Sequence, residues 1–562
     1  MDAPLLLAPT GAAAVPDSFG INLYRADPVL ARLATLYLPP DLDVHLAPHL
    51  DRLGALAGGR LDRLAWDADR NPPELRPRTR RGDDSQSILK HPSYREMERL
   101  AFGEFGLAAL SHRAGVLGWA APMPPAAKYL LTYLFVQAEF GLMCPVSMTD
   151  SLTRTLRKFG SPDLVARYLP GLLSQDVDDL NQGAMFMTEQ GAGSDVGATT
   201  VIATPADDGT WRLHGEKWFC SNADADLAMV LARPQGGPPG LKGVSLFLLP
   251  RTRPDGTANA YRIVRLKEKL GTRSMASGEV SLDGATAYLV GDPGQGFKQM
   301  ADMVNNSRLS NGVRAAGMMR RATTEALFIA HERHAFGQRL IDMPLMRRQL
   351  AKMLVWTEQA RSMMFQTAEA LRRADAAEPG AYPLLRILTP LLKFRACRDA
   401  RRVTGDAMEV RGGCGYIEEF SDARLLRDAH LGSIWEGTSN VVALDVMRAA
   451  NREGSLDALR MHVAGLSPAM LPLFERAAAL ADRARHNDPR LARQAASGLY
   501  HVTAAAAMIG RAARPAITAA VPWPRWCSAT ASCPPTRWRR TPMRTTSARR
   551  SLPDPSHRQG RT

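Results

Sequence analysis

Hydrophobic positions along the chain change their spacing twice. From about residue 91 to 184, apolar residues recur at helical spacing, as around Tyr129, Tyr133 and Leu134. The spacing then shortens, and Asp208-Gly209 between two short apolar runs predicts a hairpin. Strands are predicted over 201–204, 211–214, 227–232, 244–249, 263–266 and 279–282. Helical spacing returns at about 297 and predicts helices over 299–331, 345–375, 384–410 and 440–451, then further helix over 455–513.

Both ends of the chain differ from this pattern. Residues 1–80 are rich in Pro and Leu, with short helical runs that close in the turn-like segment 71–75 and a charged loop over 76–84. After Ala520, 42 residues hold nine Arg, seven Pro and three Trp without an apolar period. This tail is either a disordered basic arm or the product of translation in a shifted reading frame. The predicted divisions are an N-terminal extension (1–90), a helical domain (91–184), a β domain (185–290), a helical bundle (291–450), a C-terminal helical extension (451–520) and the tail (521–562).

Composition narrows the class of protein. The 562 residues are 45% hydrophobic and 23% charged, as in globular proteins, and no apolar run is long enough to cross a membrane. The first residues lack the basic segment of a secretory signal, so we expect a cytoplasmic protein. Six cysteines without a C-x-x-C pair favour neither disulfides nor a metal site. The tail carries about half of the net charge of +15, a charge that permits a polyanionic partner.

Four clusters of residues could carry chemistry. They are the Gly-rich loop 187–195, the segment 217–222, Arg333 to Gly337 with Arg308 twenty-five residues earlier, and the pair of segments 409–416 and 434–440. Each also has a purely structural interpretation: a turn, a core tryptophan, a last-turn arginine before a capping glycine, and an N-cap followed by an acid near a helix start. That interpretation does not explain why all four occur in this order.

Taken together, the motifs resemble the flavin-dependent acyl-CoA dehydrogenase family over residues 91–450. They are T-E-x-G-x-G-S-D (188–195), K-W-x-x-S-N (217–222), K-L-G-x-R-S (269–274), G-x-G-F (294–297), R-x-x-F-G (333–337), G-G-x-G-Y (412–416) and E-G-T-S (436–439). N-P-P-E-L (71–75), P-L-M-R (344–347), Trp435 and L-D-V-M-R (444–448) resemble the alkylation-response branch of that family. The resemblance implies an α+β multidomain fold: a helical domain, a central β-barrel-like domain and a C-terminal helical bundle, with extra segments at both ends.

The resemblance also implies an FAD site. Thr188 and Ser194 would contact the flavin, beside Met187, and Phe219, Cys220 and Ser221 would form a wall over one ring face. Arg333, with Phe336, would hold the pyrophosphate from a neighbouring subunit, as would the turn 409–413 with Gly412 and Gly413. Glu409 stands where many relatives have Gln, and a carboxylate would repel pyrophosphate. Thr438 and Asn440 would approach the adenine dinucleotide at a helix N-terminus, and Ile434, Trp435 and Gly437 complete the predicted cofactor-binding set.

Glu436 occupies the position of the family's catalytic base, which removes the α-proton of an acyl thioester. The branch implies a homotetrameric oxidoreductase with weak activity on short branched acyl-CoA, and binding of double-stranded DNA in the alkylation response. Arg448, Arg452 and Arg460 would then meet phosphates, although arginines on amphipathic helices more often form a solvated face. The alternative is an ordinary metabolic acyl-CoA dehydrogenase whose extra helices serve only oligomerisation.

Overall fold

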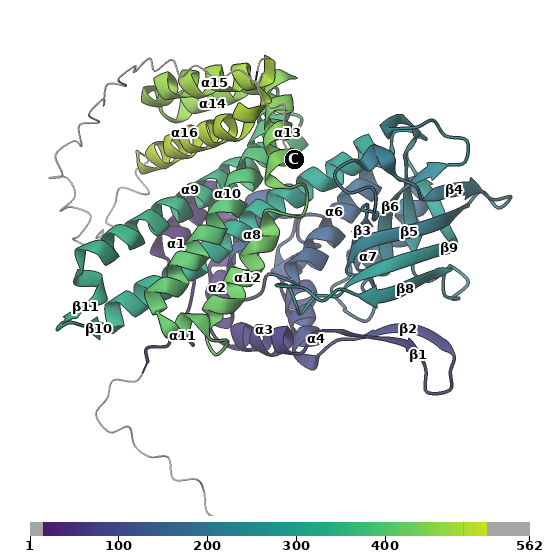
Figure 1. The fold of residues 1–562 in the computed structure, drawn as a ribbon, viewed down its shortest axis with the longest axis horizontal. Coiled ribbons are helices and arrows are strands. Elements are labelled where there is room, and N and C mark those ends of the chain that lie inside the picture. Colours follow the sequence, from purple (N-terminus) through teal and green to yellow (C-terminus); the bar gives the residue numbers. More distant parts are fainter. Residues whose placement is uncertain (1–14, 453, 487, 514–562) are drawn as a thin grey trace, which may run out of the picture.

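The computed structural model describes residues 15–452, 454–486 and 488–513, and the tail predicted over 521–562 lies outside them. Figure 1 shows a β-barrel on one side and helices on the other. The helices are α1 Pro28–Tyr37, α2 Pro40–Gly58, α3 Arg60–Arg70, α4 Pro92–Glu98, α5 Pro125–Phe135, α6 Met143–Phe159, α7 Pro162–Leu172, α8 Gly296–Glu332, α9 Pro344–Asp375, α10 Ala381–Arg411, α11 Gly413–Tyr416, α12 Ser421–Gly432, α13 Ser439–Asn451, α14 Ser455–Leu466, α15 Leu471–His486 and α16 Ala492–Ala512.

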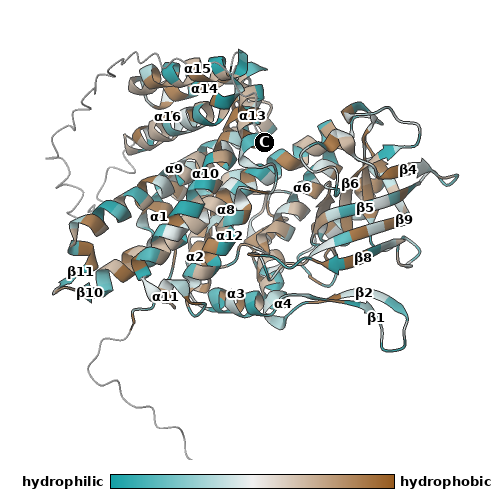
Figure 2. Cartoon of the chain, viewed as in Figure 1, coloured by the Kyte–Doolittle hydropathy of each residue, from teal (hydrophilic) through white to brown (hydrophobic). Residues whose placement is uncertain are grey.

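The strands are β1 Glu74–Arg78, β2 Asp84–Leu89, β3 Gly183–Phe186, β4 Ile202–Pro205, β5 Trp211–Ser221, β6 Leu227–Pro234, β7 Ser245–Pro250, β8 Tyr261–Leu266, β9 Ser277–Val290, β10 His334–Ala335 and β11 Gln338–Arg339. Strands β4, β5, β9, β7 and β6 pair in a ring that closes because β6 pairs with both β7 and β4. In β5, Leu213, Lys217 and Cys220 are buried while His214, Glu216 and Phe219 are exposed, and Figure 2 shows hydrophobic and hydrophilic positions along the barrel strands. The β-barrel-like domain between helical domains is thus confirmed.

Three long helices, α8, α9 and α10, run side by side at the centre of the helical part (Figure 1). They match the helices predicted from the returning 3.6-residue period. Leu309, Val313, Met353, Leu388 and Leu392 are among the side chains that close their shared core. Helix α8 is buried along almost its whole length, so polar side chains on it must find partners inside the protein.

The N-terminal segment shares this core, and buried ion pairs hold it there. The Asp27 carboxylate forms ion pairs with Arg361 (2.5 Å) and Arg320 (3.2 Å). The Asp62 carboxylate on α3 forms ion pairs with Arg424 (2.5 Å) and Arg321 (3.1 Å). Each of these contacts joins residues more than 250 positions apart in the chain.

Residues 76–84, predicted as a charged loop, belong instead to a hairpin of β1 and β2. Ile88 of β2 is buried in the barrel core. Gln86 accepts two hydrogen bonds from the barrel, one at its side-chain oxygen from Ile263 N (2.9 Å) and one at its backbone oxygen from Arg251 (2.6 Å). The prediction of a loop was wrong because contacts with the barrel, absent from the local sequence, stabilise extended backbone in a polar segment.

Removing the charge of Asp27 tests the buried ion pairs. Asp27→Asn leaves the guanidinium groups of Arg320 and Arg361 without their shared carboxylate, and we expect a loss of about 3–5 kcal/mol in the free energy of unfolding. Urea and thermal unfolding followed by circular dichroism measure it. The control is Asp51→Asn, which breaks the exposed pair with Arg25 and should leave unfolding unchanged. Equal, small effects of both variants would contradict the prediction.

Candidate functional site

The Gly-rich loop and the segment 217–222 lie against each other on the barrel. Trp218 N donates to Thr188 O at 2.8 Å, and the buried Lys217 ammonium contacts Glu189 at 2.8 Å. Glu189 also accepts from the backbone and hydroxyl of Thr200. Glu189 and Lys217 therefore fix the loop rather than face solvent, and the exposed part of the loop is Gln190, Gly191 and 193–195.

Neighbouring positions of β5 point to opposite faces of the strand. Phe219 is 56% exposed, whereas Cys220 is fully buried in the barrel core. The side chain of Cys220 is therefore inside the barrel, and only its backbone lies on the ligand side. Ser194 is exposed, and Met187, Thr188 and Ser221 are half-buried around the same surface.

Glu436 lies in the connection before α13 and meets helix α8. Its Oε1 accepts from the Ser307 hydroxyl at 2.9 Å, while its Oε2 is buried without a hydrogen-bond partner among the described residues. Arg308 Nε donates to the Glu436 carbonyl at 3.0 Å, and the buried Lys393 ammonium donates to the next carbonyl, that of Gly437. Glu436 has a φ of 54°, a conformation that costs on the order of 1–3 kcal/mol and that this bracing offsets.

The electrostatic surroundings of Glu436 suit a proton acceptor stronger than an ordinary carboxylate. Burial raises the pKa of Glu436, and the Ser307 hydrogen bond and the cations Arg308, Lys393 and Arg314 oppose that rise. Burial also lowers the pKa of Lys393 to about 8. A carboxylate with a raised pKa and one free oxygen can accept a proton from a bound molecule. The interpretation of Glu436 as a simple acid near a helix start does not explain its bond to α8.

The predicted cofactor residues fall into two groups. Arg333 follows α8, and its guanidinium donates to Arg411 O at 3.0 Å, beside Gly412 and Gly413. Ser307 lies near the other end of α8, about 39 Å away at 1.5 Å per residue. Figure 1 shows the β10–β11 hairpin at the opposite end of the bundle from α13. Phe336 at the tip of this hairpin is 96% exposed.

The second cofactor segment surrounds the start of α13. Thr438 is the N-cap residue, yet its side chain makes no capping hydrogen bond and it is exposed. Asn440 is exposed and accepts from Arg493 at 3.4 Å. Ile434 is exposed, and Gly437 has a φ of 94°, in the left-handed region that favours glycine.

The three arginines predicted to bind DNA are exposed on α13, α14 and the turn between them. Arg460 forms an ion pair with Glu475 at 2.5 Å, which partly neutralises it. Arg448 lies near Asp445, whose carboxylate is already held by Arg308 and Arg386. Arg448 and Arg452 are thus better placed than Arg460 to meet an external anion.

Sequence reasoning missed the polar residues of α8 that face Glu436. Ser307, Asn311 and Arg314 follow the i, i+4, i+7 spacing of one helix face. Asn311 and Arg314 are fully buried, and Arg314 stacks on the Trp435 ring with its guanidinium carbon 4.8 Å from the ring centroid. Polar residues recurring at this spacing along a long helix are the signal that could have revealed them.

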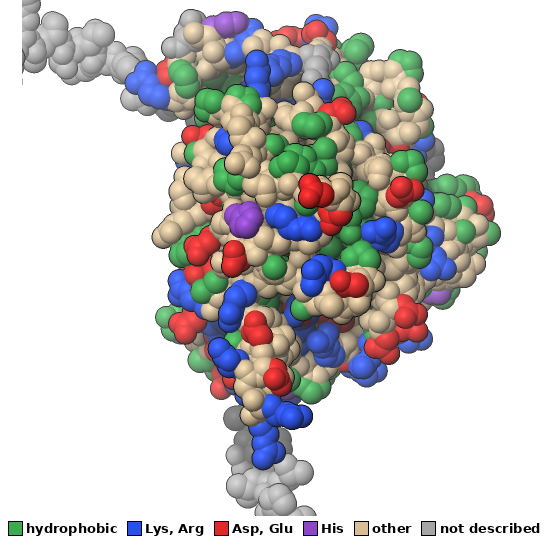
Figure 3. Space-filling model, turned by 90° about the vertical axis from the view of Figure 1, so that its right-hand side faces the viewer, with side chains coloured by type: hydrophobic (Ala, Val, Ile, Leu, Met, Phe, Trp, Pro, Cys, Tyr) green, Lys and Arg blue, Asp and Glu red, His purple; other side chains and the backbone are tan. Residues whose placement is uncertain are grey.

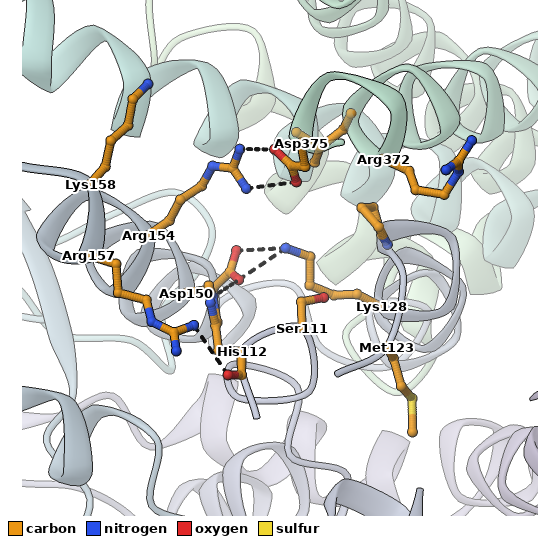
Figure 4. A pocket seen from close by; sticks show the side chains of 12 residues that line it. Ser111, His112, Met123, Lys128, Asp150, Arg154, Arg157, Lys158, Arg372 and Asp375 are labelled. Carbon is orange, nitrogen blue, oxygen red and sulfur yellow. Dashed lines mark hydrogen bonds and ion pairs between the residues drawn. The ribbon is translucent and has the colours of Figure 1, made fainter. Parts of the chain in front are cut away.

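A separate, cation-rich cavity of about 400 Å³ lies between α5, α6 and the end of α9 (Figure 4). Several of its charges are paired: Lys128 and His112 contact Asp150, and Arg154 contacts Asp375. Asn306, next to Ser307, donates to the same Asp150 at 2.9 Å, so the cavity adjoins the α8 segment that carries Ser307. Among the described residues, Arg157 has a backbone oxygen but no carboxylate as partner, and Ser111 Oγ is buried without a hydrogen bond.

The described ranges contain neither a membrane-spanning helix nor a metal site. No helix there is long and apolar enough to cross a membrane. No group of His, Cys, Asp and Glu in the same residues could hold a metal ion. Cys144, Cys220, Cys397 and Cys414 are free thiols in the structure.

Models of known families match most of the chain. The adaptive response protein AidB N-terminal domain matches residues 14–179, the acyl-CoA dehydrogenase middle domain 184–285, and the acyl-CoA dehydrogenase C-terminal domain 294–451. The acyl-CoA dehydrogenase AidB of Escherichia coli is 35% identical over 77% of this chain and 79% of its own. Acyl-CoA dehydrogenase family member 11 of Caenorhabditis elegans is 33% identical over 76% and 70%.

A solved structure extends the similarity to the fold. Caenorhabditis elegans ACDH-11 in complex with C11-CoA superposes with a TM-score of 0.84 at 29% identity, covering 91% of each chain. The three central domains, residues 91–450, make up a much smaller share of this chain than 91%. The superposition therefore also includes segments before and after them.

Replacing the hydroxyl at Ser307 tests the electrostatics at Glu436. Since the Ser307 hydrogen bond lowers the pKa of Glu436 against the effect of burial, Ser307→Ala should raise that pKa further, so that a smaller fraction is ionised at pH 7. Difference infrared spectroscopy of the carboxyl band over a pH series, with Glu436→Gln to assign the band, measures it. Ser310→Ala on the same helix is the control and should leave the titration unmoved. An unchanged or lowered pKa in Ser307→Ala would refute the assignment.

Proposed function

Because the chain belongs to the acyl-CoA dehydrogenase family, we propose that it is an FAD-dependent oxidoreductase that acts on acyl-CoA thioesters with Glu436 as the base. The observation that carries the proposal is the Glu436 carboxyl group: buried, bonded through Oε1 to Ser307, and free at Oε2. A carboxylate in a water-poor site with a raised pKa is what abstraction of an α-proton requires.

The residues present fit a flavin. Phe219 offers an exposed aromatic face, and the exposed Gly191 has open space where another residue would place its Cβ. The Thr438 side chain makes no cap hydrogen bond at the start of α13, where the helix dipole favours a phosphate. Bound there, the flavin would accept the β-hydride of the acyl group.

The chain's own residues would then divide the remaining work. Glu436 takes the α-proton on its free Oε2, while the Ser307 hydroxyl holds Oε1. Arg308 and Lys393 fix the backbone of the loop through the carbonyls of Glu436 and Gly437. The related ACDH-11 was solved with C11-CoA, which supports a CoA thioester as the substrate class. Within that class we propose weak dehydrogenation of short branched acyl chains.

We further propose that two copies complete each cofactor site. Arg333 and Gly412 lie about 39 Å along α8 from Ser307, so the pyrophosphate residues of one chain do not serve that chain's own flavin wall. The exposed Phe336 beside Arg333 supports a contact with a second copy. A homotetramer would repeat this arrangement.

A second proposed function, binding of double-stranded DNA in the alkylation response, is favoured by the exposed Arg448 and Arg452 and by the match to the AidB N-terminal domain. On the face in Figure 3, Lys and Arg are interspersed with Asp and Glu, so that face offers no continuous basic surface. The competing proposal is a metabolic dehydrogenase without a nucleic-acid partner.

Exchanging the base tests the enzymatic proposal. Glu436→Gln should retain fold and FAD, because the amide has nearly the same shape, but should abolish flavin bleaching by isovaleryl-CoA, because an amide cannot accept the α-proton. Its thermal midpoint at pH 7 should match or exceed that of the wild type. A carboxyl whose pKa is raised by folding contributes stability at low pH that is lost as pH rises through the raised pKa, and Gln does not titrate.

The exposed Glu332→Gln at the end of α8 serves as control and should bleach like the wild type. Equal bleaching by Glu436→Gln and the wild type would remove Glu436 from the mechanism. A wild-type protein that releases no flavin on heating would overturn the assignment of the cofactor.

Shortening the chain separates the two proposals about DNA. In a chain that ends at Ala520, which removes the nine tail arginines, Arg448→Ala should weaken binding to unrelated duplexes about equally and reduce the salt slope by about one. Fluorescence anisotropy over a salt series measures both. The exposed Arg25→Ala is the control and should change neither. A shortened protein that carries FAD and oxidises acyl-CoA but binds no duplex at low salt would favour the metabolic alternative.

A further inference from the structure

Arg314 is a buried cation beside Glu436 that lacks a carboxylate of its own. The residue is 1% exposed, and its guanidinium carbon lies 4.8 Å from the centroid of the Trp435 ring and 5.3 Å from that of Phe140. Its Nε donates to Ser310 O, within its own helix, at 3.4 Å. Its NH1 has no hydrogen-bond partner among the described residues.

Other deeply buried arginines of the bundle are paired. Arg361 contacts Asp27, Arg321 contacts Asp62 and Glu325, and Arg411 contacts Glu325 and Asp422. Arg314 has instead the thiol of Cys144 as a polar neighbour, and burial raises the pKa of that thiol to about 11, so it is neutral. An unpaired buried charge costs several kcal/mol, and such a cost persists where the group serves a ligand.

Further unsatisfied polar atoms belong to the residues around Arg314. Both amide atoms of Asn311, the indole Nε1 of Trp435 and Oε2 of Glu436 are buried without a hydrogen-bond partner in the described part of the chain. Asn311 lies less than one turn before Arg314 on α8, and Trp435 directly precedes Glu436. NH1 of Arg314, Nδ2 of Asn311 and Nε1 of Trp435 are three unused donors, one of them charged.

We propose that this cluster is the specificity site for the acyl group, and that it takes CoA thioesters whose short acyl chain ends in a carboxylate. The inference rests on the proposed function, since it requires the acyl α-carbon to face Glu436. The two rings border the guanidinium, and its planar edge carries the free NH1 that a carboxylate recognises through charge-assisted hydrogen bonds. An acyl chain ending in a methyl group would leave these donors unsatisfied, and sites of that kind discriminate strongly.

Matched pairs of thioesters isolate the terminal group. Succinyl-CoA against butyryl-CoA, and glutaryl-CoA against valeryl-CoA, exchange a carboxylate for a methyl group at constant carbon number. Titration calorimetry of the flavin-loaded protein should give at least tenfold tighter binding of the carboxylated member of each pair. Arg314→Met, which keeps a long apolar side chain, should lose that preference and bind the methyl-terminated members as well as or better than the wild type.

Control variants separate a specific effect from a general loss. Arg398→Met, at a partly exposed arginine of α10, should leave the preference intact. Arg314→Lys keeps the charge but lacks the planar guanidinium group, so it should retain only part of the preference for carboxylated thioesters. This variant also replaces Arg314→Met in the test if Arg314→Met does not fold. Preference for the methyl-terminated thioesters in the wild type, or equal weakening of both members by Arg314→Met, would overturn the proposal.

The two proposals fail in different ways. If butyryl-CoA bleaches the wild-type flavin and the carboxylate gives no advantage, the dehydrogenase assignment stands and the specificity assignment falls. If no thioester of either kind binds or bleaches, both fall. Binding of neutral long-chain thioesters alone would show that Arg314 and Trp435 only close the end of the site.

Discussion

The cost of burying charge along helix α8 governs the arrangement of the other segments. Arg308, Arg314, Arg320, Arg321 and Glu325 lie on one helix that is almost wholly removed from water. All of them except Arg314 form an ion pair with a residue remote in sequence. Arg320 and Arg321 contact Asp27 and Asp62 near the N-terminus, Arg308 contacts Asp445 on α13, and Glu325 contacts Arg411 on α10. The loop that carries Glu436 is held by the same helix. The same helix therefore positions both the N-terminal segment and the loop that carries Glu436.

Much of this architecture is readable from the sequence, because local periodicity reports which face of an element is buried. The predicted helices over 299–331, 345–375 and 384–410 differ from α8, α9 and α10 by a few residues, and the predicted hairpin is formed by β4 and β5. The hairpin of β1 and β2 escaped prediction because its polar residues form strands only against the barrel. Contacts between distant segments leave no periodic mark in the sequence.

For the candidate site, the sequence identified individual residues but not how they are arranged in space. Motifs identified Glu436, Thr188 and Arg333, since each stands in a short pattern of unusual composition. Order along the chain could not show that Arg333 lies at the far end of α8, nor that Cys220 points into the barrel core while Phe219 faces outward. Arg314 illustrates a further gap: an arginine in a helix is ordinary until the structure shows that its buried guanidinium has no carboxylate hydrogen-bonded to it.

Through the contacts of Gln86 and Ile88, the N-terminal region is attached to the barrel as well as to the helical bundle. The same stretch of chain is anchored in the bundle through Asp27 and Asp62, and Lys90 contacts both Glu98 and Asp224 at the base of the hairpin. The barrel is joined to the bundle both by the main chain and by the β1–β2 hairpin, so it cannot rotate as it could about a single hinge. Barrel and bundle are thus locked in orientation, and a molecule entering the space beside Glu436 must do so by local displacement of loops and side chains, not by a swing of one domain away from the other.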